Sequence, residues 1–472
     1  MMESDFNEHD KTALAALVEQ FEQYLKDNAY SYFDEEGLEM LLEYYEMRNL
    51  PEREEAVIDF ALSQNPFSSE FLVRKAELLL NRKRYAEALE ILDKAQLFDS
   101  REIDIYLLRS DIFVEQNKVE EAEKVLLDAL EFADDSDKDS IYAELSDIYE
   151  IQEQFDKAFD ALSMALKFNA ASEDALQKLA HIVDMTDRYE ESVKIHSNII
   201  EQDPYSWMAW FNLGRSYVGL GFYEKALECF EYVMAIEENF DLVYRDAADI
   251  YYRLEDFEKA IAMFETANEK SIGYEDYSFR IGLCYERMNN FKSARFQFRK
   301  AARQDPYMHE AFFRIGETYR LENRLDPALV NYKKALHLDE TNEDYICTII
   351  SMYKILERED EVIENLELLV AVRPDILSYW LDYIGFMFES EMYERALQII
   401  DSAIHRAGHY AEFYYLQSAA SAAVGDMRTA IVVLEQALSI DYARHTILYE
   451  MMPEVALLPD FQKRILQFGP GN

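Results

Sequence analysis

A spacing of 34 residues recurs along this chain and limits what it can fold into. From Trp207, a 34-residue frame fits seven times without an insertion and ends at Arg444. Positions 4, 7, 8 and 11 of the frame share one face of a helix, and positions 20, 24 and 27 share one face of a second helix. Each copy is therefore expected to be a pair of amphipathic helices joined by a short turn. Because one pair cannot bury its apolar faces alone, successive pairs must stack.

Three copies carry matching residue types at these positions. Small residues at positions 8, 20 and 27 allow the paired helices to approach closely, and an aromatic residue at position 24 fills the gap to the next pair. A proline near position 32, as at Pro204, Pro306 and Pro374, ends the second helix. The matching residues are Trp210, Leu213, Gly214, Tyr217, Ala226, Phe230 and Val233; Ile281, Gly282, Tyr285, Ala294, Phe298 and Ala301; and Phe312, Ile315, Gly316, Tyr319, Ala328, Tyr332 and Ala335.

These residues resemble the tetratricopeptide repeat (TPR) family. The W-x₂-L-G-x₂-Y and A-x₃-F-x₂-A signature appears as Trp210 to Tyr217 and Ala226 to Val233, with Val233 at the final small position. Extended backwards, the frame gives about twelve units over nearly the whole chain, similar to long bacterial cytoplasmic TPR arrays. The resemblance implies an all-α, right-handed superhelical solenoid.

The frame divides the chain into four regions. Residues 1–34 are expected to form an N-terminal capping helix, and 35–206 contain degenerate to moderate units, of which 103–138 is two residues longer. Residues 207–444 form the seven regular units, and 445–472 are expected to form a C-terminal capping helix and tail. In the copy from Leu377, glycine comes one place late, which predicts that its first helix slips by one residue.

The composition excludes several classes of protein and partner. Only 12 glycines and 9 prolines occur in 472 residues, which argues against turn-rich β architectures. With 47 basic and 94 acidic residues, the net charge of −47 disfavours nucleic acid and anionic membranes as partners. No segment offers 18 uninterrupted apolar residues, so no membrane insertion is expected. Three dispersed cysteines suit a reducing, cytoplasmic compartment.

No motif in the sequence indicates catalysis or a bound cofactor. The chain contains no phosphate-binding glycine loop, nucleophile elbow or dinucleotide fingerprint. His405 and His409 have a spacing that can bind a metal, but they lack a zincin glutamate and are better interpreted as surface histidines near a helix end. His196 occupies position 24 and is interpreted as a core residue. The protein is therefore predicted not to be an enzyme.

The charge distribution points to a central binding surface. Residues 1–206 have a net charge of −30. Residues 275–342, with 12 basic and 10 acidic residues, have a net charge of +2. In the TPR family, positions 2, 5, 6, 9, 12 and 13 of the first helix line a peptide-binding groove. Carried over, these positions give Phe211, Asn212, Arg215, Arg245, Asp249, Tyr252, Arg253, Phe279, Arg280, Arg287, Phe313, Arg314 and Arg320.

Two interpretations of the groove arginines are open. Arginine pairs with carboxylates through a planar fork and stacks on aromatic rings, which suits an acidic or C-terminal peptide. Alternatively, the arginines form ion-pair ladders with acids such as Asp246, Asp249 and Glu317 on adjacent helices. A second basic cluster is expected on the convex side, either as a solvated face or as a docking patch for an acidic partner: Lys292, Arg295, Arg299, Lys300 and Arg303.

The resemblance implies a function through binding. The leading hypothesis is a protein–protein interaction scaffold that holds one or more proteins or peptides, acidic ones among them, in the concave groove. The alternative is a regulatory subunit or a co-chaperone-like module that acts on an enzyme supplied in trans.

Overall fold

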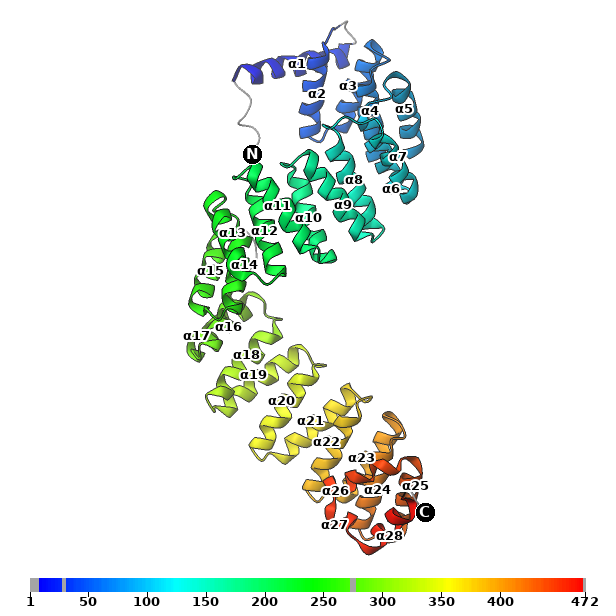
Figure 1. The fold of residues 1–472 in the computed structure, drawn as a ribbon, viewed down its shortest axis with the longest axis vertical. Helices are drawn as coiled ribbons and strands as arrows, with labels where there is room; N and C mark the ends of the chain where they lie inside the picture. The colour runs from blue at the N-terminus through cyan, green and yellow to red at the C-terminus, as the bar shows by residue number, and fades with distance from the viewer. Residues whose placement is uncertain (1–7, 28–30, 272–276, 470–472) are drawn as a thin grey trace. The chain divides into compact units, whose positions relative to one another are not determined.

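The computed structural model describes residues 8–27, 31–271 and 277–469, where every regular element is a helix. The chain forms two compact units, residues 1–243 and 244–472 (Figure 1). The first unit contains α1 (Glu8–Asp27), α2 (Glu35–Met47), α3 (Pro51–Gln64), α4 (Ser69–Asn81), α5 (Tyr85–Phe98), α6 (Ile103–Glu115), α7 (Val119–Leu130), α8 (Lys138–Ile151), α9 (Phe155–Phe168), α10 (Glu173–Thr186), α11 (Tyr189–Gln202), α12 (Trp207–Gly219) and α13 (Tyr223–Ile236).

The boundary between the units falls inside α14 (Asp241–Arg253). The second unit continues with α15 (Phe257–Lys270), α16 (Ser278–Arg287), α17 (Phe291–Gln304), α18 (His309–Leu321), α19 (Leu325–Leu338), α20 (Glu343–Ile355), α21 (Glu359–Val372), α22 (Leu377–Glu389), α23 (Tyr393–Arg406), α24 (Ala411–Ala423), α25 (Met427–Ile440), the 3₁₀ helix η1 (Tyr442–His445), α26 (Thr446–Met451), α27 (Pro453–Ala456) and α28 (Pro459–Phe468). Most consecutive helices within each unit pack against one another.

A left-handed turn residue marks each helical hairpin. These residues follow the first helix of each pair at position 15 of the frame, where the chain reverses into the second helix. They are Asn49, Lys83, Asn117, Glu153, Asp187, Gly221, Glu255, Asn289, Asn323, Glu357, Glu391 and Gly425. The spacing is 34 residues throughout except for 36 between Asn117 and Glu153. The all-α solenoid of about twelve hairpins is therefore confirmed; below, the first helix of each hairpin is its A helix and the second its B helix.

The unit 103–138 is two residues longer than the others, and these two residues lie in the connection between this hairpin and the next. Seven residues separate α7 from α8, whereas four separate α9 from α10. The hairpin before this connection keeps its turn at Asn117, so the insertion lengthens the loop and leaves the frame within each hairpin intact.

The expected slip of the first helix from Leu377 is wrong. Helix α22 begins at Leu377, the first position of the frame, and ends at Glu389, position 13, as its equivalents do. Ile384 fills position 8 and is fully buried, and Gly385 lies one place later beside the methyl group of Met451. The register is kept because an isoleucine packs where other copies place a small residue.

The core of a regular hairpin is built around one close contact. The aromatic ring at position 24 of the B helix lies directly over the glycine at position 8 of the A helix. A β-carbon placed on Gly282 would lie 2.5 Å from Phe298 Cε1, and one on Gly316 would lie 2.6 Å from Tyr332 Cδ1. Only glycine therefore fits under these rings without displacing them.

Further helices cover the ends of the repeat array. Helix α1 packs on α2 and contributes the fully buried Phe21, and α28 packs on α25 through the buried Phe461 and Ile465. The C-terminal segment contains three short helices, α26 to α28, where the sequence suggested one helix and a tail. Residues 470–472 of the expected tail lie outside the described residues.

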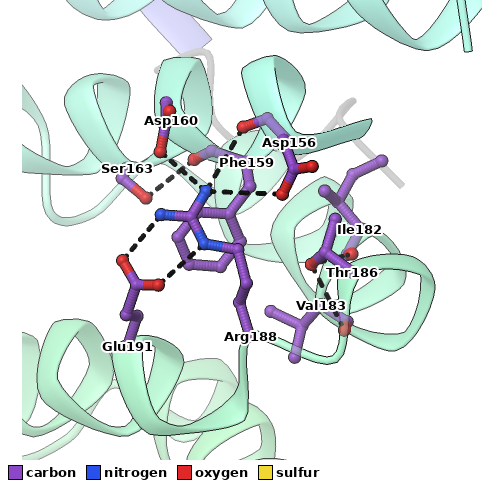
Figure 2. Close-up of polar contacts among 9 residues, drawn as sticks. All are labelled: Asp156, Phe159, Asp160, Ser163, Ile182, Val183, Thr186, Arg188 and Glu191. Atoms are coloured by element: carbon purple, nitrogen blue, oxygen red, sulfur yellow. Dashed lines mark hydrogen bonds and ion pairs between the residues drawn. The ribbon is translucent and has the colours of Figure 1, made fainter. Parts of the chain in front are cut away.

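An arginine clamp joins two successive hairpins of the first unit. Arg188 follows the left-handed Asp187, and its guanidinium lies over the Phe159 ring, 3.9 Å from the ring centroid (Figure 2). It donates to Glu191 Oε2 at 2.6 Å and to Asp160 Oδ1 at 2.8 Å, which raises the pKa of the guanidinium above its usual value. The clamp thus ties the start of α11 to helix α9 of the preceding hairpin.

Replacing Arg188 with alanine should lower the free energy of unfolding by about 1 to 2 kcal/mol, because the ring contact and the charged hydrogen bonds are lost together. Urea unfolding followed by far-UV circular dichroism measures this loss. Arg84 stands at the same position of its hairpin and ion-pairs with Glu87, but its side chain is 46% exposed. Arg84→Ala is therefore the matched control and should have a much smaller effect; equal effects would contradict the clamp.

Candidate functional site

Ion pairs connect successive A helices along one surface of each unit. In the first unit, Lys178 on α10 pairs with Asp147 on α8, with Nζ 2.9 Å from Oδ2. Arg215 on α12 pairs with Asp184 on α10. These residues occupy positions 6, 9 and 12 of the frame, which were expected to line the groove. The side chains are 27–41% exposed, so the ladder lies at the surface.

The second unit continues the same pattern. Arg280 on α16 pairs with Asp249 on α14. Arg314 on α18 lies 3.6 Å from the carboxylate of Glu286 on α16 and 3.6 Å from that of Glu310 on its own helix. Of these acids, the ladder interpretation named only Asp249; Glu286 joins adjacent A helices in the same way, whereas Glu310 lies on the same helix as Arg314.

The remaining predicted arginines differ in their partners. Arg287 pairs with Glu255 at 2.8 Å, Arg320 with Glu317 at 2.7 Å, and Arg245 with its neighbour Asp246 at 2.8 Å. Arg253 is exposed and makes no ion pair within residues 8–27, 31–271 and 277–469.

Two residues predicted to line the groove are buried instead. Phe211 is 8% exposed and packs edge-on against Phe240, with ring centroids 4.9 Å apart. Asn212 is 5% exposed, and its Nδ2 donates to the carbonyl oxygen of Leu176 on α10 at 2.8 Å. Both side chains are therefore used in packing between helices, and we remove them from the candidate surface.

The other predicted aromatic residues are partly exposed at the edges of helix contacts. Phe313 stacks on Tyr345, with ring centroids 4.6 Å apart, and Phe279 lies 5.5 Å from the ring of Phe298. The guanidinium carbon of Arg287 lies 5.9 Å from the centroid of the Tyr252 ring. These rings present partial apolar surface beside the arginines of the ladder.

One member of the predicted convex cluster is also buried. Arg295 is 8% exposed; it pairs with Glu322 at 3.0 Å and lies 4.4 Å from the centroid of the Tyr319 ring. It therefore joins α17 to α18 and is unavailable to a partner. Lys292, Arg299, Lys300 and Arg303 are exposed on α17 as expected.

Sequence reasoning missed two half-buried carboxyl groups in the first unit. Burial, and then the charges of Asp147, Glu77 and Glu115, raise the pKa of Asp111 on α6 to about 6. Burial and the charge of Asp111 raise the pKa of Glu144 on α8 to about 7. In a chain with 94 acids the sequence gives no sign of these two, because the shifts arise from helices that meet only on folding.

A hollow of about 500 Å³ lies between α4 and α6. It is lined mainly by charged side chains, among them Glu77 and Asp111. Within the part of the chain that the structure describes, no group of three or more His, Cys, Asp or Glu side chains is arranged to hold a metal ion. His405 and His409 are exposed near the end of α23.

His196 belongs to the core, as the sequence predicted. Its side chain is fully buried on α11, and its Nδ1 lies 2.9 Å from the carbonyl oxygen of Ser192 and 3.1 Å from the hydroxyl of the same residue. Burial lowers the pKa of the imidazole to about 4. The histidine is therefore neutral at physiological pH and supports packing.

Comparisons with known proteins agree with the repeat frame. Three sequence profiles, each described as a tetratricopeptide repeat, match residues 207–240, residues 38–102 and 245–309, and residues 309–342. A search of curated proteins found no match. None of the described helices is both long and apolar enough to cross a membrane.

Several solved structures resemble the chain at low sequence identity. The APC/C hetero-tetramer Cut9–Hcn1 shares 16% identity, with 92% of this chain and 94% of that chain covered and a TM-score of 0.41. PilW, a type IV pilus biogenesis factor, shares 20% identity over 43% of this chain and 94% of its own, with a TM-score of 0.36. YrrB, described as a TPR protein with an unusual peptide-binding site, shares 23% identity over 39% and 95%, with a TM-score of 0.29.

Tetratricopeptide repeats generally mediate protein–protein interactions and scaffolding. Here the twelve left-handed turns, the glycine–aromatic contacts and the matched profiles all follow one 34-residue frame. The chain is a tetratricopeptide repeat protein.

Proposed function

We propose that this protein is a non-catalytic scaffold that binds protein segments along the surface formed by its A helices. The ion-pair ladder supports this proposal, because it holds a line of polar side chains in fixed positions while leaving them partly exposed. Preorganised side chains lose less conformational entropy on binding than free ones, so several weak contacts along the array add up to useful affinity.

The surface of α16 and α18 is the part best suited to an acidic segment. Arg280, Arg287 and Arg320 are each held by one carboxylate, yet their side chains remain 45–50% exposed. A guanidinium has five N–H donors, so one carboxylate partner leaves donors for a ligand. The partly exposed rings of Phe279 and Phe313 lie on the same two helices and add apolar contact.

Binding of a fluorescein-labelled acidic peptide tests this surface. We expect the double substitution Arg280→Glu with Arg314→Glu to weaken binding about tenfold, measured by fluorescence anisotropy, because two attractive charges become repulsive. Arg48→Glu with Arg101→Glu makes the same change in net charge on exposed residues of the first unit and is the control. If the two double variants weaken binding equally, only the net charge matters and the proposed surface is wrong.

A second substitution tests whether Arg280 of the ion-pair ladder binds the peptide or only joins neighbouring helices. Asp249→Asn removes the internal carboxylate that competes with a ligand for Arg280. If Arg280 binds the peptide, this variant should bind it about threefold more tightly. Unchanged or weaker binding, with helix content preserved in circular dichroism, would show that the ladder only joins helices.

A further inference from the structure

The outer faces of α17 and α19 carry the same chemical pattern at equivalent positions. Position 22 is apolar, positions 25 and 26 are basic, and position 29 is arginine or histidine in both helices. In α17 these residues are Phe296, Arg299, Lys300 and Arg303; in α19 they are Val330, Lys333, Lys334 and His337. All eight are exposed, Phe296 to 66% and Val330 to 56%. We call these eight residues the B-helix patch.

Four positive charges of the B-helix patch have no acidic partner among the residues that the structure describes. Arg299, Arg303, Lys333 and Lys334 form no ion pair with any residue that the structure describes, in contrast to most arginines of the A-helix ladder. Arg299 Nη2 donates to the hydroxyl of Tyr319 at 2.9 Å, and Lys334 Nζ lies 5.8 Å from the centroid of the Phe312 ring. In a chain with twice as many acids as bases, four such cations on neighbouring hairpins form a local site of opposite charge.

Acidic residues bound the B-helix patch on both sides along the array. Position 25 of four successive B helices is Glu265, Arg299, Lys333 and Glu367, and all four side chains are exposed. The hairpin before the patch also has Glu269 at position 29. The positive surface is therefore two hairpins wide and ends abruptly.

The two halves of the B-helix patch are close enough for one ligand to contact both. Helices α17 and α19 both pack against α18. Helices in contact lie about 8 to 10 Å apart, so the axes of α17 and α19 are at most about 20 Å apart. An extended segment of about six to seven residues spans this distance.

We propose that the B-helix patch is a second docking surface, which binds a short acidic protein segment carrying at least one apolar side chain. Carboxylates of the segment pair with the four cations, and its apolar side chain covers Phe296 and Val330. A nucleic acid or a membrane fits less well, because a long polyanion or an extended anionic plane also meets Glu265 and Glu367. This surface lies on the B helices and is independent of the proposed A-helix surface.

The test uses the full chain carrying Arg280→Glu and Arg314→Glu, so that any remaining binding reports on the B helices. The probe is a fluorescein-labelled 14-residue peptide built from glutamate and leucine, and a matched peptide with glutamine in place of glutamate is its control. Further substitution of Arg299, Lys333 and Lys334 by glutamate should weaken residual binding of the acidic peptide at least about tenfold. Phe296→Gln should weaken it about threefold.

Matched variants and a second probe make the outcome decisive. Lys94, Lys124 and Lys194 are exposed lysines on the B helices α5, α7 and α11, and changing all three to glutamate makes the same change in net charge. This control should leave binding nearly unchanged. Equal loss in both triple variants, or no residual binding to begin with, would overturn the docking surface without affecting the A-helix proposal. Tighter binding of a 20-nucleotide poly-uridine RNA than of the peptide would also overturn it and assign the patch to nucleic acid.

Discussion

Replacing Gly282 with leucine is expected to lower the free energy of unfolding by about 2 to 3 kcal/mol. A β-carbon at this position already lies 2.5 Å from Phe298 Cε1, so the fully buried ring has to move. Leucine gains about 1 kcal/mol over glycine in helix propensity, which is too little to offset the overpacking. Urea unfolding followed by circular dichroism measures the loss, and hydrogen exchange of α16 and α17 localises it.

A double-mutant cycle tests the cause of this loss. Other hairpins pair a larger residue at position 8 with a smaller one at position 24, as Ala76 with Leu92. Gly282→Ala with Phe298→Leu should therefore be more stable than the sum of the single variants predicts, by about 1 kcal/mol. Additive effects would show that the Phe298 ring does not limit the size of the residue that fits at position 282.

A helical glycine without such a ring is the control. The atom that a β-carbon on Gly385 would meet is the terminal methyl of Met451, 2.8 Å away at the end of a flexible side chain. Gly385→Ala should therefore be neutral or slightly stabilising, since the methionine can move and alanine favours the helix. A cost equal to that of Gly282→Ala would contradict the proposed contact.

The sequence predicted the hairpins well because their physics is local. Helix periodicity, small residues at fixed positions and the turn at position 15 all act within 34 residues, so even the irregular unit 35–68 keeps its left-handed Asn49. The array of hairpins could therefore be predicted without knowledge of contacts between distant residues.

The candidate site was harder to predict because exposure depends on neighbouring hairpins. Asn212 has a groove position in the frame, yet it reaches back 36 residues to the carbonyl oxygen of Leu176. Arg295 belongs to a basic cluster in sequence, yet it is held by Glu322 on the next hairpin. The second half of the B-helix patch, on α19, is not contiguous in sequence with the first. Its residues stand 34 positions further along the chain and join those of α17 only when successive hairpins stack.

Lowering the pH from 8 to 6.5 is expected to stabilise the region of α6 and α8, although acidification destabilises most proteins through their paired carboxylates. The pKa of Asp111 is about 6 in the folded chain against an ordinary 3.8, and that of Glu144 is about 7 against 4.5. The folded state therefore binds these protons more tightly than the unfolded state. Their contribution to stability is complete below the unfolded pKa values and is lost as the pH rises through 6 and 7.

The size of this effect follows from the two shifts. Each pKa unit corresponds to about 1.4 kcal/mol, and both groups are shifted by about two units. Because the carboxyl groups are partly exposed, solvent screening reduces the sum, and we expect a combined gain of about 2 to 3 kcal/mol between pH 8 and acidic pH. Beyond burial, Asp147, Glu77 and Glu115 raise the pKa of Asp111. Asp111, Asp147 and Asp174 raise the pKa of Glu144, and Lys178 lowers it.

Hydrogen exchange of the α6 and α8 amides, corrected for the intrinsic effect of pH, measures the part of this gain that develops between pH 8 and 6.5, which is about 0.5 to 1 kcal/mol and comes mostly from Glu144. The range from pH 8 to 6.5 is informative because His196 costs the first unit only about 0.4 kcal/mol there. Its pKa is about 4 in the fold against an ordinary 6.5, so this cost grows steeply below pH 6.5. Asp111→Asn with Glu144→Gln should raise protection at pH 8 and abolish its pH dependence, since the like charges are removed. Glu120→Gln with Asp128→Asn, two exposed carboxylates on α7, should leave the dependence intact. If protection in the unmodified chain instead falls on acidification, Asp111 and Glu144 are charged in the fold and their charges are compensated there, which would contradict this prediction.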